Sequence, residues 1–162
     1  CTAEQATPAC HRVALGQSII PPVASGCIDT KNSFAFTYGK VEIRAKLPKG
    51  DWIYPVITLD PYDGVQDIQN PLQLRIVESS GNTVLHSSGG SDISAHVLSG
   101  GPVTKLNPNS AGPSDRPRRW SPDLWADAFH KYELDWRKGQ IRVKVDDVEY
   151  GSVRVDAAFE KP

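Results

Sequence analysis

The fold of this chain is decided by a stretch in its middle, Pro71-Leu72-Gln73-Leu74-Arg75-Ile76-Val77-Glu78-Ser79-Ser80-Gly81-Asn82. Apolar and polar side chains alternate through its first half, which is the pattern of a β-strand with one buried face. Gln73 and Arg75 share the polar face because side chains of a strand alternate with a period of two. Glu78 has the opposite parity, so it joins them only if a β-bulge separates it from Arg75. With that bulge, the stretch places an acid, an amide and a guanidinium on one face.

Length and composition describe one ordinary globular domain. The chain has 162 residues, of which 39% are hydrophobic and 23% charged, and its net charge is −1. A near-neutral chain gives no reason to expect nucleic acid or a membrane as partner. Thirteen glycines and thirteen prolines favour many turns and short strands over long helices. No apolar run approaches the length of a membrane span.

Three cysteines leave the redox state open. Cys1 and Cys10 bound a polar segment that a disulfide would close as a small loop, and such bonds persist in oxidising compartments. Cys27 is then the odd one, either buried and free or without its partner. The alternative is three reduced thiols in a cytosolic protein.

The rest of the chain is expected to consist of short strands after an irregular N-terminal segment, residues 1–22, that ends in paired prolines. Residues 99–122 are rich in Gly, Pro, Ser and Asn, which predicts a loop, and residues 123–127 suggest a helical turn. Strands are predicted at 23–30, 34–47, 52–59, 84–86, 93–96, 129–136, 141–146 and 147–155.

Three motifs together resemble the laminarinase-like branch of glycoside hydrolase family 16. They are the central stretch 71–82, the run from Asn32 to Trp52, and the pair Phe129–Trp136 and Ile141–Asp146. The resemblance implies an all-β fold, a concanavalin-like jelly-roll sandwich of two antiparallel sheets with a concave sheet as cleft. It covers most of residues 23–162, and the domain is expected to be truncated at its C-terminal end relative to the family.

The same resemblance implies a degenerate catalytic site. The family carries Glu-x-Asp-x-x-Glu on the corresponding strand, which places the nucleophile at Gln73, the assisting aspartate at Arg75 and the acid/base at Glu78. A retaining glycosidase needs two carboxyl groups about 5–5.5 Å apart. Gln73 has no charge with which to attack, and Arg75 adds a positive charge where the transition state needs a negative one. The chain is therefore predicted not to be an enzyme.

The strand most resembles the glucanase-like domain of insect β-1,3-glucan recognition proteins, also called Gram-negative-bacteria-binding proteins. That resemblance implies a secreted, hemolymph-like location and innate immune recognition of β-1,3-glucan or another bacterial or microbial surface polymer, without a cofactor or metal. An immune serine protease or co-receptor is a further expected partner, and the resemblance favours the Cys1–Cys10 disulfide. The expected ligand-binding residues are Trp52, Tyr54, Gln73, Arg75, Glu78 and His96.

Other interpretations of the same residues stay open. Trp52 and Tyr54 are core residues in the simpler view, and His96 is then an ordinary side chain. Thr58, where active members commonly carry tryptophan, removes stacking area and favours an adaptor that binds proteins rather than sugar. The basic cluster 116–120 either grips an anionic partner or is a solvated loop. An active endo-β-1,3-glucanase would need a replacement carboxylate, from Asp60 or Asp63.

Overall fold

The computed structural model describes residues 16, 26–62, 73–103 and 116–155. The chain divides into two compact units, Cys1–Phe34 and Ala35–Pro162. In the first unit, Cys27 is a free, exposed thiol, whereas Cys1, Cys10 and nearly all of segment 1–22 lie outside the described residues. The strand predicted at 23–30 is wrong for residues 26–30. There the Asp29 carboxylate accepts the Lys31 N–H at 3.1 Å, which favours a turn.

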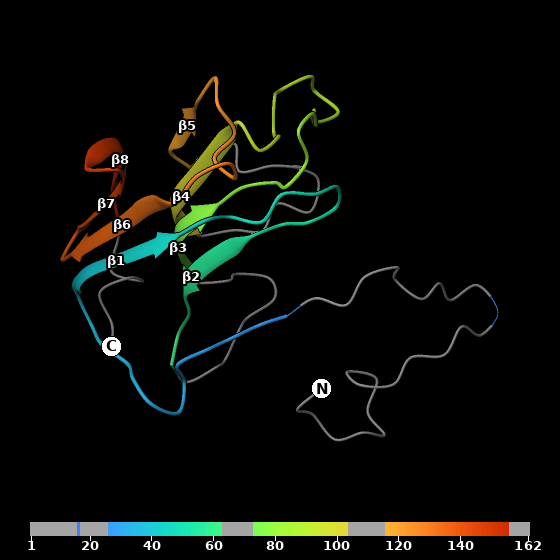
Figure 1. Cartoon of the computed structure of the whole chain (residues 1–162). Coiled ribbons are helices and arrows are strands. Elements are labelled where there is room, and N and C mark those ends of the chain that lie inside the picture. Colours follow the sequence, from blue (N-terminus) through green and yellow to red (C-terminus); the bar gives the residue numbers. More distant parts are fainter. Residues whose placement is uncertain (1–15, 17–25, 63–72, 104–115, 156–162) are drawn as a thin grey trace. The chain divides into compact units, whose positions relative to one another are not determined.

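The second unit is built from two four-stranded antiparallel sheets (Figure 1). Sheet A has the strand order β1-β6-β7-β8, and sheet B the order β2-β3-β4-β5. The strands are β1 (Gly39–Ala45), β2 (Val56–Leu59), β3 (Gln73–Glu78), β4 (Val97–Val103), β5 (Arg118–Trp120), β6 (His130–Arg137), β7 (Gln140–Val145) and β8 (Val148–Arg154). No helix occurs in the described part of the chain. The predicted fold class, an all-β sandwich of two antiparallel sheets, is confirmed.

The core contains the inward side chains of both sheets. Alternation puts every second residue of β7 inside, and those residues are buried while their neighbours are partly exposed. Sheet B contributes Leu74, Ile76, Val77 and Leu98, and sheet A contributes Tyr132, Leu134, Ile141, Val143 and Val145. The hairpin of β6 and β7 confirms the prediction at 129–146, with Gly139 at φ 73° in its turn.

Two predicted strands are shorter in the structure because backbone conformation interrupts them. Tyr38 has φ 60°, a left-handed conformation that strand pairing does not accept, so β1 begins at Gly39 and not at residue 34. Trp52 has φ 66° in the turn that follows β1. Pro55 lacks an N–H, and β2 pairs only from Val56 onward.

The region after β3 differs most from the sequence prediction. Residues 84–86 and 93–96 do not form strands; one isolated bridge joins His86 to Asp92. The predicted loop 99–122 is wrong at both ends, because β4 continues to Val103 and β5 pairs with it. Residues 123–127 form a turn in which Asp127 N–H donates to Leu124 O at 3.0 Å.

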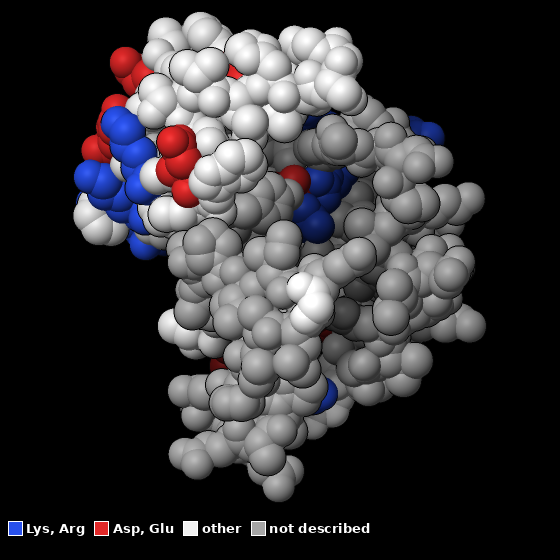
Figure 2. Space-filling model, turned by 90° about the vertical axis from the view of Figure 1, so that its right-hand side faces the viewer, with Lys and Arg blue, Asp and Glu red and all other residues white. Residues whose placement is uncertain are grey.

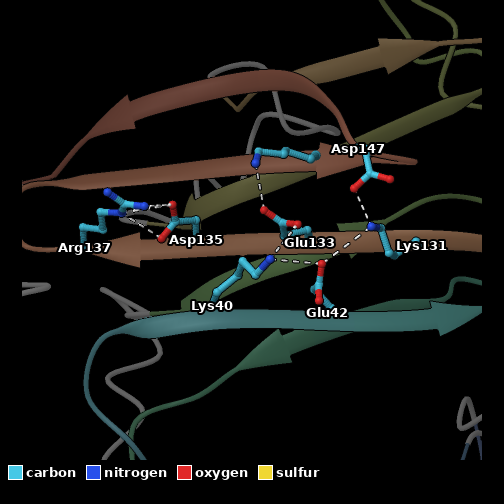
Figure 3. A network of polar contacts seen from close by, with 8 residues as sticks. Lys40, Glu42, Lys131, Glu133, Asp135, Arg137 and Asp147 are labelled. Carbon is cyan, nitrogen blue, oxygen red and sulfur yellow. Dashed lines mark hydrogen bonds and ion pairs between the residues drawn. The ribbon is translucent and has the colours of Figure 1, made fainter.

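The outer face of sheet A carries charges of both signs (Figure 3). Glu133 on β6 lies between Lys40 of β1, at 3.5 Å, and Lys144 of β7, at 2.9 Å. Along the same strand, Arg137 pairs with Asp135 at 2.9 Å. In Figure 2, Lys and Arg side chains likewise lie beside Asp and Glu side chains on the described surface. Within the described residues, no helix is long and apolar enough to cross a membrane.

Candidate functional site

The predicted β-bulge is present in β3. Arg75 lies opposite Gly101 of β4, but Glu78 lies opposite Ser99. Three steps along β3 therefore match two steps along β4, which is the geometry of a bulge. The extra residue turns Glu78 onto the face that carries Arg75, and the two side chains form an ion pair. The prediction that these groups share one face of the strand is confirmed by their contacts.

Gln73 lies between a cation and an anion on this face. Its Oε1 accepts a hydrogen bond from Arg75 Nε at 3.1 Å, and its Nε2 donates to Asp60 Oδ1 at 2.6 Å. Asp60 follows β2, and its Oδ2 accepts from Thr58 Oγ1 at 3.1 Å. The neighbours thus fix the orientation of the amide, because a donor faces its oxygen and an acceptor faces its nitrogen.

Glu78 is held by two guanidinium groups. Its Oε2 accepts from Arg75 Nη1 and from Arg116 Nη2, the latter at 2.6 Å. The Glu78 side chain is only 5% exposed and that of Arg116 only 11%. A buried carboxylate between two cations is satisfied as an ion-pair partner. Its Oε2 is not available to protonate a leaving group while both arginines hold it.

Tyr54 completes the group of contacts, since its hydroxyl accepts from Arg75 Nη1 at 3.0 Å. Burial, together with the nearby Glu78 carboxylate, raises the pKa of Tyr54 to about 12. Burial works against the charge on Arg75, but the Glu78 carboxylate outweighs it and the pKa of Arg75 is raised. Burial is the dominant influence on Arg116, and its pKa is lowered. The phenol is thus neutral at physiological pH and offers a hydroxyl beside the ion pair.

We call these six side chains the β3 face site: Tyr54, Asp60, Gln73, Arg75, Glu78 and Arg116. The site holds two arginines and two acids, so its charges balance. It presents donors and acceptors without an activated nucleophile. Such a set can hydrogen-bond a neutral, polyhydroxylated ligand.

Trp52 lies in the turn before β2 and is 82% exposed, which excludes the interpretation that it is a core residue. Its backbone N–H donates to Asn82 Oδ1 at 3.2 Å, and the Asn82 amide in turn donates to Asp51. This turn is therefore attached to the segment that follows β3. The indole is presented to solvent from a fixed backbone.

His96 lies next to a different part of sheet B. Its Nδ1 is 2.9 Å from Ser121 O, and its ring stacks on Trp120 with centroids 6.0 Å apart. These contacts belong to the β4–β5 end of the sheet, whereas Gln73, Arg75 and Glu78 are joined to one another on β3. A ligand-binding role for His96 stays a prediction.

Sequence reasoning missed Arg116 and assigned Asp60 only to a less favoured alternative. Arg116 was placed in a basic loop cluster, but its side chain reaches Glu78 across 38 positions of sequence. Asp60 does reach Gln73, the position where the sequence resemblance expects the nucleophile, and there it accepts a hydrogen bond from the Gln73 amide. Asp63 lies outside the described residues. No local spacing joins Arg116 to Glu78, because 38 positions of sequence separate them.

The two packed antiparallel sheets define the class of the fold, the glucanase-like jelly rolls. The structure is similar to the laminarinase from Flavobacterium sp. UMI-01, with a TM-score of 0.59 and 21% identity over 80% of this chain and 51% of that chain. At this identity the likeness shows the fold alone. No family model matches the sequence.

Sequence similarity points to a narrower group. The chain is 40% identical over 167 residues to a beta-1,3-glucan-binding protein of Hyphantria cunea, covering 98% of this chain and 32% of that protein. It is 38% identical over 155 residues to Gram-negative bacteria-binding protein 2 of Drosophila melanogaster, covering 94% of this chain and 33% of that protein. The chain thus spans about a third of the length of these relatives. It is a homologue of the insect β-1,3-glucan-binding proteins in the part that it covers, which confirms the predicted resemblance.

Proposed function

We propose that this chain is a catalytically silent, glucanase-like recognition domain that binds β-1,3-glucan, or a related microbial surface polysaccharide, in innate immunity. The observation that carries the proposal is the Glu78 carboxylate, held by Arg75 and Arg116 beside an uncharged Gln73. The relatives support it, because their names describe binding proteins rather than glucanases.

Hydrolysis fails at both steps of the retaining mechanism. Attack on the anomeric carbon needs a carboxylate where Gln73 has an amide, and the Glu78 carboxylate that would have to transfer the proton is held at Oε2 by Arg75 and Arg116. Arg75 also opposes the developing positive charge of the sugar. Asp60 does not take the place of a nucleophile, because the Gln73 amide lies between it and Arg75, accepting from Arg75 and donating to Asp60.

Sugar binding does not need the catalytic carboxylates, because it depends on hydrogen-bonding groups and on exposed aromatic rings. Amide, guanidinium and phenol groups can exchange hydrogen bonds with sugar hydroxyls, and the exposed Trp52 and Tyr54 rings offer faces for stacking. The balanced charge of the β3 face site favours a neutral glucan over a strongly anionic polymer. Extracellular location, a Cys1–Cys10 disulfide and recruitment of an immune serine protease belong to the same proposal.

Co-sedimentation with insoluble β-1,3-glucan tests the proposal, with cellulose as the polysaccharide control. The folded chain should pellet with the β-1,3-glucan and not with cellulose, and it should release no reducing sugar from laminarin. Tyr54→Phe should weaken pelleting because it removes the hydroxyl that Arg75 contacts. Tyr62→Phe, at another exposed tyrosine, should leave pelleting unchanged. Absence of pelleting by folded protein would contradict sugar recognition and favour the protein-binding adaptor.

A further inference from the structure

Trp120 lies on the same face of sheet B as the β3 face site. In the register of sheet B, Glu78 of β3 lies opposite Ser99 of β4, and Ser99 lies opposite Arg118 of β5. Residues directly opposite one another in a sheet point to the same side, and so do residues two apart along a strand. Trp120, two residues after Arg118, therefore faces the same side as Glu78. Arg119, with the opposite parity, lies over the ring of the buried Trp125 instead.

The Trp120 ring is exposed yet fixed in place. It is 59% exposed, and the His96 ring stacks against it at an interplanar angle of 24°. Its indole N–H is close enough to the Asp92 carboxylate to lower the pKa of Asp92. The backbone on either side is also held, because Trp120 pairs with Val97 in β4 and Ser121 N–H donates to His96 O at 2.9 Å.

A fixed aromatic ring with exposed surface suits one kind of ligand. Sugar rings have apolar faces that stack on aromatic faces, and a ring already held in position loses little conformational entropy when it binds. Trp120 lies roughly 12 Å from Glu78 across the sheet, as strand spacing and residue rise require. One sugar unit at the β3 face site would not cover that distance, but a chain of several units crossing the strands would.

We propose that Trp120, backed by His96, forms a second sugar-binding subsite that contacts a distant unit of an extended glucan chain. This rests on the proposed function. It assigns His96 a supporting role beneath the indole in place of direct contact at the β3 face site. It also makes chain length, and not only sugar identity, a determinant of affinity.

The test measures affinities of the full chain for laminarioligosaccharides of increasing length by titration calorimetry. Trp120→Ala should weaken binding of the longer oligosaccharides about three- to tenfold, in line with the worth of one aromatic contact, and leave the shortest binder unchanged. Trp120→Phe should restore part of the loss because it keeps a ring. The matched control is Phe129→Ala, which removes an aromatic side chain of similar exposure next to Arg44 of sheet A and should change nothing.

The outcomes separate the two proposals. If the wild type binds and Trp120→Ala binds every length equally well, the subsite is overturned and the proposed function stands. A uniform loss at all lengths would also overturn it, because it would reveal a general structural effect. If folded wild-type protein binds no oligosaccharide, the proposed function fails and the subsite fails with it.

Discussion

The Gln73 amide uses both of its ends, accepting from Arg75 and donating to Asp60. Gln73 Nε2 lies 2.6 Å from Asp60 Oδ1. A glutamate at this position would put a negatively charged oxygen in place of that nitrogen, and the two carboxylates would repel each other. The neighbours of Gln73 therefore favour an amide over a carboxylate at this position. A Gln73→Glu change alone would be opposed by Asp60.

The double variant Gln73→Glu, Arg75→Asp introduces the carboxylates that the sequence resemblance implies for an active member, but it should not give robust hydrolysis of laminarin. Arg116 still holds Glu78 Oε2 at 2.6 Å, so the proton donor remains in an ion pair, and the repulsion from Asp60 remains as well. Release of reducing sugar is the measurement, with the wild type as baseline. Strong hydrolysis would show that only the two acids had been lost.

Glu78→Gln should lower the free energy of unfolding by about 3 kcal/mol, because it leaves two buried guanidinium groups without their carboxylate. Urea denaturation measures the change. The matched control is Glu42→Gln on the outer face of sheet A, where the ion pair with Lys40 is exposed. There the loss should be much smaller, as is usual for surface pairs. If both variants lost the same free energy of unfolding, burial would not be what makes the Glu78 ion pairs important.

Asp92 gives stability a pH dependence. Burial alone would raise its pKa, but hydrogen bonds from Ser94 and Trp120 outweigh burial, and the pKa is lowered. A carboxyl with a lowered pKa contributes stability above its ordinary pKa of 3.8 and loses it as pH falls through the folded value. The stability difference between wild type and Asp92→Asn should therefore be present at pH 6 and shrink toward pH 3. Urea denaturation at several pH values measures the difference, and a difference that stays constant down to pH 3 would contradict the lowered pKa.

At the scale of elements, local patterns predicted some strands and not others. β3, β6 and β7 were predictable because their alternation, the bulge and the Lys138–Gly139 turn are all encoded within a few residues. Most of β4, residues 99–103, falls in the predicted loop because it contains Gly100, Gly101 and Pro102. It is a strand because it pairs with β3 and β5, and those contacts between distant segments have no local signature.

The residues of the site also divide into those that a local pattern predicts and those that only the fold brings together. Gln73, Arg75 and Glu78 could be grouped from one strand, whereas Arg116 reaches them only through the fold. Trp120 lies in the predicted loop 99–122, and only the pairing of β5 with β4 gives its side chain a defined face. Contacts that depend on strand pairing across long separations therefore lay beyond prediction from the sequence.

Gly100 shows why β4 tolerates no side chain at that position. A Cβ there would lie 2.6 Å from the Tyr150 hydroxyl and 3.0 Å from Ile76 O. Gly100→Ala should therefore destabilise the protein by about 1–3 kcal/mol, as measured by denaturation. Gly89→Ala, where the nearest atom is Ser87 Oγ at 3.9 Å, serves as control and should be nearly neutral. A neutral Gly100→Ala would mean that β8 can move away from β4.

At the scale of the whole molecule, the two sheets of the second unit present different outer faces. Sheet A carries charged side chains of both signs, paired along and between its strands (Figure 3). Sheet B carries the β3 face site, with Trp120 on the same side. Net charge is −1, so the molecule as a whole exerts little attraction on a charged polymer. Recognition should depend on local contacts.

The dependence of binding on salt concentration should distinguish a neutral ligand from an anionic one. Raising ionic strength from 0.05 to 0.5 M should leave binding to β-1,3-glucan nearly unchanged, because stacking and hydrogen bonds to neutral hydroxyls are not screened. Binding to an anionic bacterial polymer would fall steeply over the same range. Co-sedimentation at both salt concentrations measures the difference. A steep loss with β-1,3-glucan would contradict a charge-balanced site.

Within the six residues of β3, the bulge separates the residues that form the core from the residues that form the β3 face site. Leu74, Ile76 and Val77 point into the sandwich, while Gln73, Arg75 and Glu78 are grouped by their contacts on the other face of the strand. An engineer could in principle vary the second set as a library while holding the first constant, with Arg116 and Asp60 varied in step to keep the charges matched. The strand would then serve as an interchangeable cassette, on which new binding specificities could be selected without redesigning the scaffold.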